Sequence, residues 1–176
     1  RELNLGPDFL AAHAAVHPHA QTLALLLHHR EAVFGALVGP LGKGPAARLS
    51  LPPLLALLGA LARDLQRDFL PLLPAAVAAF GALIDAGAHR EPELLGHVFG
   101  GLARCCKALF KFLARDVPGF LAATRRLRLH RVAHVREFAA QACAYVLQHA
   151  GGDQAAAGVA AAVGDYAAAE APDKEA

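Results

Sequence analysis

The residues of this chain that could do chemistry are basic side chains gathered in its central part. Between residues 101 and 137, nine lysines and arginines stand against two acidic residues, although the 176-residue chain has a formal net charge of only +2. A cationic segment in a near-neutral chain is typical of a surface that binds phosphates or acidic partners. The candidate contact residues for RNA or for a partner protein are Arg104, Lys107, Lys111, Arg115, Arg125, Arg126, Arg128 and Arg131.

Charge patterning alone leaves two interpretations of this basic segment open. The side chains could bind RNA phosphates, which would make binding sensitive to salt. They could equally form a solvated helix face or a docking site for an acidic protein. Aromatic and basic residues do not alternate as they do in single-strand stacking platforms, because the two tyrosines and most phenylalanines fall at core spacing.

Histidine and cysteine residues offer weaker candidates. His130 and His134 are four residues apart and would share a helix face, as metal ligands do, but no third ligand accompanies them. The adjacent Cys105 and Cys106 lack the two-residue gap of a chelating or redox pair, so we interpret them as structural thiols in a helical core. With Cys143 they make an odd number, which favours a reducing compartment over a disulfide framework.

Catalytic and membrane-spanning motifs are not evident. The sequence has no phosphate-binding glycine loop, no nucleophile elbow and no convincing carboxylate pair. We therefore expect no enzymatic activity, no cofactor, no metal and no small-molecule substrate. The longest uncharged candidate for a membrane span, Phe69 to Ile84, is shorter than the roughly 20 residues needed and contains two prolines, so no membrane contact is expected.

One long helix, predicted over residues 92–115, would position the first four basic residues. At helical period, its apolar residues fall on one side and Glu93, His97, Arg104, Lys107 and Lys111 on the other, which makes the helix amphipathic. The apolar side consists of Leu95, Val98, Phe99, Leu102, Cys106, Leu109 and Leu113.

The rest of the chain also favours helix, since it is rich in alanine and leucine and poor in isoleucine and threonine. Ser50 and Asp116 stand where helix caps are expected. Further helices are predicted over residues 9–16, 23–38, 51–65, 68–84, 117–127 and 131–150, with a loop over 42–47. Residues 153–171 are expected to form a marginal alanine-rich helix, and 172–176 a frayed tail.

Helix pairs recur at roughly 40-residue spacing, beginning near Ser50, Pro92 and His130. That period predicts an all-α fold, an α-solenoid of antiparallel helix pairs of the HEAT or armadillo type. The pattern Val135-Arg136-x-x-Ala139-x-x-Ala142 is typical of a HEAT helix. We expect HEAT-like repeats over residues 1–150, as an excerpt of a longer solenoid, and a weak helix and tail over 151–176.

Three stretches carry a closer resemblance. They are residues 61–71 (LARDLQRDFLP), Pro92-Glu93-Leu94-Leu95 with the apolar residues up to Leu113, and Val135-Arg136-Glu137-Phe138-Ala139-Ala140 with Tyr145-Val146-Leu147. Their order and spacing resemble the early repeats of the down-regulated-in-metastasis (DRIM) family, giant HEAT-repeat scaffolds of the small-subunit processome. Together the matching stretches cover about half the chain, between Leu51 and Leu147. Gly100-Gly101 departs from that family, in which larger residues are usual.

The resemblance implies a non-catalytic nucleolar scaffold in small-subunit ribosome biogenesis and pre-18S rRNA processing. Its implied partners are pre-ribosomal RNA, small nucleolar RNA and other processome assembly factors, and the family has no catalytic residues to transfer. The alternative is a HEAT-type transport or protein-complex adaptor without RNA contact, and a helical enzyme domain is a third, remote class.

Overall fold

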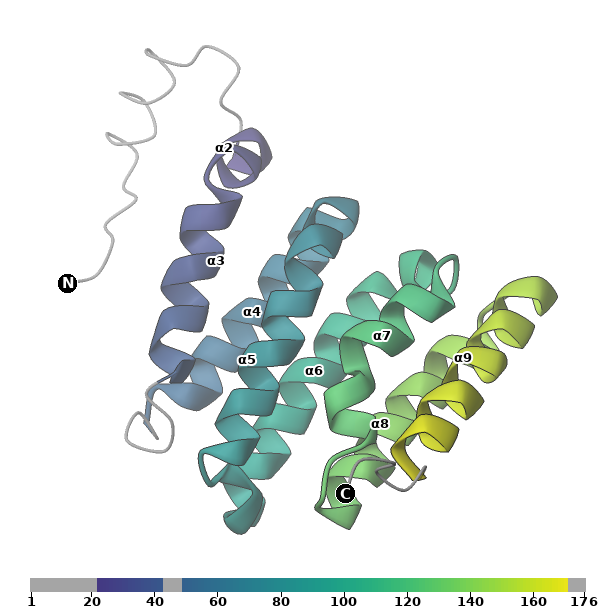
Figure 1. Ribbon diagram of the computed structural model, residues 1–176. Helices are drawn as coiled ribbons and strands as arrows, with labels where there is room; N and C mark the ends of the chain where they lie inside the picture. Colours follow the sequence, from purple (N-terminus) through teal and green to yellow (C-terminus); the bar gives the residue numbers. More distant parts are fainter. Residues whose placement is uncertain (1–21, 43–48, 171–176) are drawn as a thin grey trace, which may run out of the picture.

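The described part of the chain consists of α-helices and short 3₁₀ segments and contains no β-strand, which confirms the all-α fold class (Figure 1). The computed structural model describes residues 22–42 and 49–170. The α-helices are α2 (Thr22–His28), α3 (Arg30–Val38), α4 (Leu51–Leu65), α5 (Leu73–Asp85), α6 (Pro92–Leu113), α7 (Val117–Arg128), α8 (Ala133–Gln148) and α9 (Gly152–Glu170). The 3₁₀ segments include Gln66–Leu72 between α4 and α5 and Ala88–Arg90 before α6.

Proline and aspartate explain where several helices begin. Helices α4, α5, α6 and α7 each have proline in the first two positions, where its missing N–H costs no hydrogen bond. Asp116 caps α7, because its Oδ1 accepts a hydrogen bond from the Gly119 N–H at 3.0 Å. Ser50 holds the corresponding position before α4, but its side chain makes no capping hydrogen bond, contrary to our expectation.

The helices lie in two layers (Figure 1). Helices α4, α6 and α8 form the rear layer in this view and α5, α7 and α9 the front layer, and α3 packs against α4 at one end. Within each layer, contacts join every second helix of the chain: α4 with α6 and α6 with α8 in one layer, α5 with α7 and α7 with α9 in the other. Successive helix pairs are therefore stacked side by side.

A continuous hydrophobic core fills the space between the layers. Gly101 of α6 is tightly packed in this core, since a Cβ there would be 3.3 Å from both the Leu55 Cβ and the Phe80 Cε1. A glycine at this position lets α6 approach α4 and α5 closely. This close packing explains a glycine at position 101, one of the two positions where larger residues are usual in the DRIM family.

Helix α9 stands where an alanine-rich helix was predicted, over nearly the same residues. It packs against α7 and α8, and its buried residue Gly158 faces Val117 of α7. The expected boundary between a repeat region ending at residue 150 and a separate weak helix therefore divides elements that pack together, and α9 completes the front layer.

Two predicted helices have different bounds in the structure. The segment expected as a helix from residue 68 is 3₁₀ up to Leu72, after Gln66 adopts a positive φ of 51°, and α5 begins at Leu73. The helix expected over 23–38 is divided into α2 and α3 at His29. The helix over 9–16, the 43–47 part of the loop and the tail over 172–176 lie outside the described residues.

The helical segment Leu51–Asp85 is long and apolar enough to cross a membrane by length and composition alone, in contrast to the sequence-based expectation that no segment spans one. Its most apolar window is 44% buried inside the protein. The chain also reverses direction within the segment, because α4 and α5 run in opposite directions on either side of the 3₁₀ segment (Figure 1).

Candidate nucleic-acid interface

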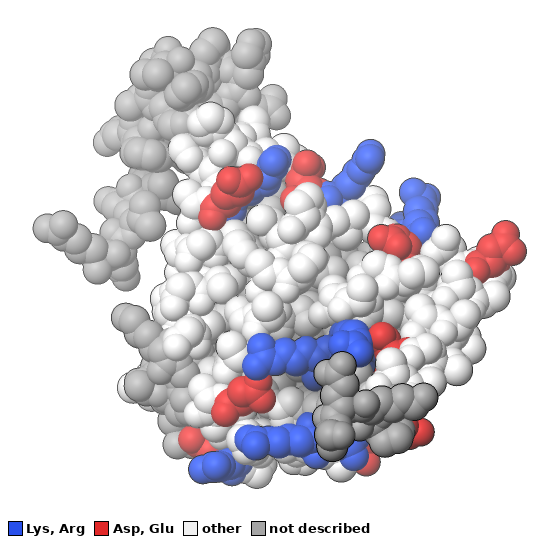
Figure 2. Space-filling model, in the orientation of Figure 1, with Lys and Arg blue, Asp and Glu red and all other residues white. Residues whose placement is uncertain are grey.

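The basic residues of α7 form ion pairs with the helices on either side. Arg126 pairs with Asp85 at the end of α5, and Arg125 Nε donates to Asp165 Oδ1 of α9 at 2.8 Å. Figure 2 shows the face formed by α5, α7 and α9, where positive and negative side chains lie next to one another around a wide uncharged area. Arg125 and Arg126 are thus exposed but already paired, and both help to join the front-layer helices.

Arg128 is part of the interior and not of a contact surface. Its side chain is 2% exposed, and Nη2 donates to Asp165 and to the Leu121 carbonyl, the latter at 3.0 Å. Its Nε and Nη1 have no hydrogen-bond partner among the described residues, but its Cζ lies 5.8 Å from the centre of the Tyr166 ring. The expectation that Arg128 binds an external partner is therefore wrong, because water and ligands do not reach it.

The ion pairs lower the pKa values of the two aspartates that take part in them. Hydrogen bonds from Arg128 and Arg125 lower the pKa of Asp165. Burial alone would raise the pKa of Asp85, but the hydrogen bond from His130 and the neighbouring charge of Arg126 outweigh it, so that pKa is also lowered. Both carboxylates remain ionised at neutral pH, which keeps the pairs intact.

The other basic residues of the central segment, three in α6 and one just after it, have a different environment. Arg104, Lys107, Lys111 and Arg115 are all exposed, and no acidic side chain of the described residues forms an ion pair with any of them. The Arg104 stem lies across Gly59 of α4, where a Cβ would be 3.0 Å from the Arg104 Cβ. Together these four residues form the α6 basic stripe, which is available to an anionic partner.

Arg131 is exposed too, but it precedes α8. Its carbonyl accepts a hydrogen bond from Arg136 Nη1 at 2.9 Å. Helices α6 and α8 run in the same direction, since Phe99 stacks on Phe138 and Phe110 contacts His149. Arg131 therefore lies beside the start of α8, whereas Lys111 lies near the end of α8.

Three aromatic rings that sequence reasoning missed lie next to the stripe. Phe110 of α6 contacts Tyr145 of α8 and His149 just after it, with centroids 6.5 and 5.2 Å apart, and Tyr145 and His149 are 4.7 Å apart. The Lys111 Nζ lies 5.9 Å from the centre of the Phe110 ring. The four-residue spacing of Tyr145 and His149 is a local signal of a shared helix face, but no local pattern indicates Phe110, which is 35 residues before Tyr145.

The histidine pair does not form a metal site in the described residues, which contain no cluster of three suitable ligands. His130 is buried and His134 is exposed. The His130 Nδ1 accepts the Val132 N–H at 3.1 Å, so its Nε2 carries the proton and donates to Asp85 at 2.9 Å. Both ring nitrogens of His130 are therefore used in closing the turn between α7 and α8.

The cysteines are buried, as expected for structural thiols. Burial raises the pKa of the Cys105 and Cys106 thiols to about 12, so both stay protonated and weakly nucleophilic at neutral pH. Cys143 is also buried, and its pKa is raised for the same reason.

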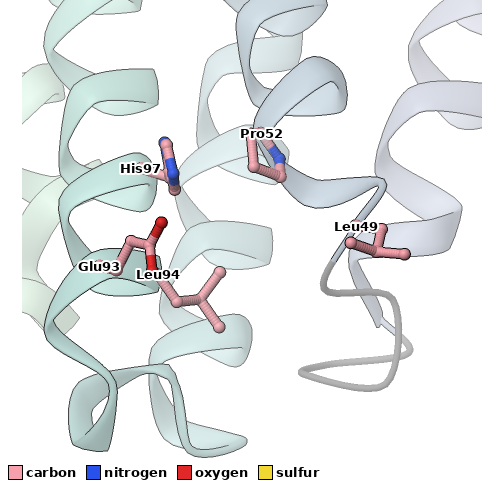
Figure 3. A pocket seen from close by; sticks show the side chains of 5 residues that line it. All are labelled: Leu49, Pro52, Glu93, Leu94 and His97. Atoms are coloured by element: carbon pink, nitrogen blue, oxygen red, sulfur yellow. The ribbon is translucent and has the colours of Figure 1, made fainter.

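A shallow hollow lies between the starts of α4 and α6 (Figure 3). Its volume is about 180 Å³, and it is lined by Leu49, Pro52, Glu93, Leu94 and His97. Glu93 and His97 are one helical turn apart at its rim, and the other lining side chains are apolar. Such a small, mostly apolar hollow does not resemble the deeper pockets that enclose small molecules.

A comparison of the chain with sequence models of known protein families finds no match.

Proposed function

We propose that this chain is a non-catalytic scaffold of the α-solenoid type, built from HEAT-like helix pairs. The support comes from its stacking: the pairs α4 with α5, α6 with α7 and α8 with α9 follow one another, and corresponding helices lie side by side. In an α-solenoid each unit buries its apolar face against its neighbours and leaves extended outer surfaces for partners. Measurable turnover in a hydrolase or transferase assay would contradict this proposal.

We further propose that the scaffold acts in small-subunit ribosome biogenesis, in the nucleolus, among pre-ribosomal RNA, small nucleolar RNA and processome assembly factors. The resemblance to the DRIM family supports the process, and its three stretches fall on α4 with the following 3₁₀ segment, on α6 and on α8. The observation that carries RNA contact is the α6 basic stripe, whose four cations are exposed and free of ion pairs among the described residues. An unneutralised row of cations attracts phosphates and releases their counterions.

The RNA contact is tested by reversing charges at two places on the surface. The double variant Lys107→Glu with Lys111→Glu should lose most crosslinking to RNA. The matched control is Arg67→Glu with Arg90→Glu, which changes the net charge equally at two exposed arginines outside the candidate contact residues. The control should retain crosslinking. Unchanged crosslinking in the first variant, or an equal loss in both, would remove the stripe as a specific RNA surface.

The alternative function is a HEAT-type transport or protein-complex adaptor, and one feature of α9 favours it. Val159, Val163 and Tyr166 are exposed to 52%, 62% and 40% on this helix. Adjacent exposed apolar side chains are common at protein contacts. Fractionation distinguishes the two functions: recovery of the protein with small-subunit precursors supports the processome scaffold, whereas cofractionation with a transport receptor's cargo supports the adaptor.

A further inference from the structure

Phe110, Tyr145 and His149 form an aromatic cluster at one end of the seam between α6 and α8. The Phe110 and Tyr145 side chains are half-buried and His149 is exposed, so the cluster presents ring surface to solvent. Deeper in the seam, Cys106 and Val146 are buried and already close the core. The outward ring surface is therefore not needed to exclude water from the interior.

Two of these rings are held in fixed positions. The His149 Nδ1 is 2.7 Å from the Tyr145 carbonyl oxygen, so the ring donates this hydrogen bond to the last turn of α8. His149 lies between Phe110 and Tyr145, and the Tyr145 ring is tilted by 67° against Phe110 and by 48° against His149. Rings that are already ordered lose little conformational entropy when a flat ligand stacks on them.

The charged residues of α6 beside the cluster are cations. Lys111 lies against Phe110, Lys107 is one helical turn earlier, and Arg115 follows the end of α6. Of the two acids nearest in the sequence, Asp153 belongs to the first turn of α9, and Asp116 directs its carboxylate to the Gly119 N–H, where it caps α7. A partner at this place would therefore meet aromatic faces and unneutralised cations together.

We propose that this cluster is a stacking site for an unpaired base of single-stranded RNA, with Lys107 and Lys111 binding the phosphates on either side. Aromatic faces beside a cationic track are the combination by which proteins hold single strands without reading their sequence. A duplex keeps its bases stacked internally and cannot offer one to the cluster. The proposal rests on the RNA contact proposed above and specifies that the bound RNA is single-stranded.

Intrinsic fluorescence gives a direct test, because the chain has two tyrosines and no tryptophan. In the variant Tyr166→Phe, Tyr145 is the sole tyrosine and so reports on the cluster. In the variant Tyr145→Phe, the ring is kept but emission comes from Tyr166 on α9, which makes this variant the matched control. Adding a short uridine oligonucleotide should quench the first variant and leave the second unchanged, once absorption by the RNA is corrected equally in both.

Binding of the same oligonucleotide, measured by fluorescence anisotropy of a label on the RNA, completes the test. Tyr145→Leu should weaken binding about tenfold, in line with the loss of one stacked base, whereas Tyr145→Phe should bind as the natural chain does. The exposed His149→Ala gives a second readout that does not depend on the fold tolerating leucine at position 145, and it should also weaken single-strand binding. Duplex RNA of equal length should be insensitive to these changes.

The outcomes separate this inference from the proposed function. Charge-dependent RNA binding without tyrosine quenching, and without an effect of Tyr145→Leu or His149→Ala, would overturn the stacking site but preserve the basic stripe. No RNA binding at all, or tight binding of a polyglutamate peptide in its place, would overturn both proposals.

Discussion

Helices α6 and α7 both carry basic residues in their last turns, but those side chains meet different neighbours. In α7, Arg125 and Arg128 share Asp165 of α9, and Arg126 pairs with Asp85 at the end of α5. In α6, Lys107 and Lys111 are exposed and pair with no acid of the described residues. Residues of one chemical type thus join helices in the front layer and remain available to a partner in the rear layer.

The difference arises from what the adjacent helices place at the same level. Helix α7 is flanked by α5 and α9, each of which contributes one aspartate near the basic turn. Helix α6 is flanked by α4 and α8: near its last turns α8 contributes the ring of Tyr145, and Asp64, near the end of α4, pairs with Arg63 of its own helix. A local count of charges therefore overestimates a binding surface wherever stacked neighbours supply counter-charges.

The largest expected effect comes from removing the buried arginine. Arg128→Ala should lower the free energy of unfolding by about 3 kcal/mol, because the change creates a cavity and removes the internal cation facing Asp165. Lys111→Ala, on the exposed face of α6, should change it by no more than about 0.5 kcal/mol. Urea denaturation of both variants checks the contrast, and equal losses would show that the two helices do not differ in this way.

A smaller loss is expected where α9 closes over α7. A Cβ on Gly158 would lie 2.4 Å from the Val117 Cγ1, so Gly158→Ala must displace α9 and should cost about 2 kcal/mol. Gly164 is the matched position in the same helix, with no atom within 4 Å of its Cβ direction, and Gly164→Ala should stabilise the protein by up to about 1 kcal/mol. If both substitutions stabilise, α9 does not pack on α7 as described.

The same contrast shows which features the sequence could predict. Periodicity and proline positions predicted α4, α6, α7 and α8 to within a few residues, because these signals are local. The apolar side of α6 was also predicted, and Leu95, Val98 and Leu109 are among its buried residues. The helix expected over 153–171 is present as α9, but its anchors, Gly158 and Asp165, depend on contacts with α7 that no pattern within those residues reveals.

Within the candidate site, the exposure of the basic side chains could be predicted for α6 but not for α7. An amphipathic pattern separates Lys107 and Lys111 from the apolar side of their own helix. Arg128 follows no such rule, because its burial depends on Asp165 and Tyr166, more than 35 residues later in the sequence. The aromatic cluster was missed for the same reason, since it joins two helices.

Acid should weaken the α7 pairs and leave the stripe unaffected. The pKa values of Asp85 and Asp165 are lowered in the folded protein, so both contribute stability that is complete above their unfolded pKa of about 3.9 and lost as the pH falls further. Thermal melting should therefore show a decline in stability below about pH 4. The double variant Asp85→Asn with Asp165→Asn should be less stable at pH 7 but show a shallower decline. A decline as steep as that of the natural chain would assign the acid sensitivity to other carboxylates.

The smallest expected difference between α6 and α7 concerns the salt dependence of RNA binding. Each phosphate neutralised by a lysine should contribute about 0.7 to the slope of log K against log salt for a single strand. Lys107→Gln and Lys111→Gln should each lower the slope by about that amount. Arg125→Gln should leave it unchanged, although Arg125 is half-exposed, because its charge is already balanced by Asp165. A reduced slope for Arg125→Gln would mean that phosphates compete with Asp165, and that the front layer also takes part in binding.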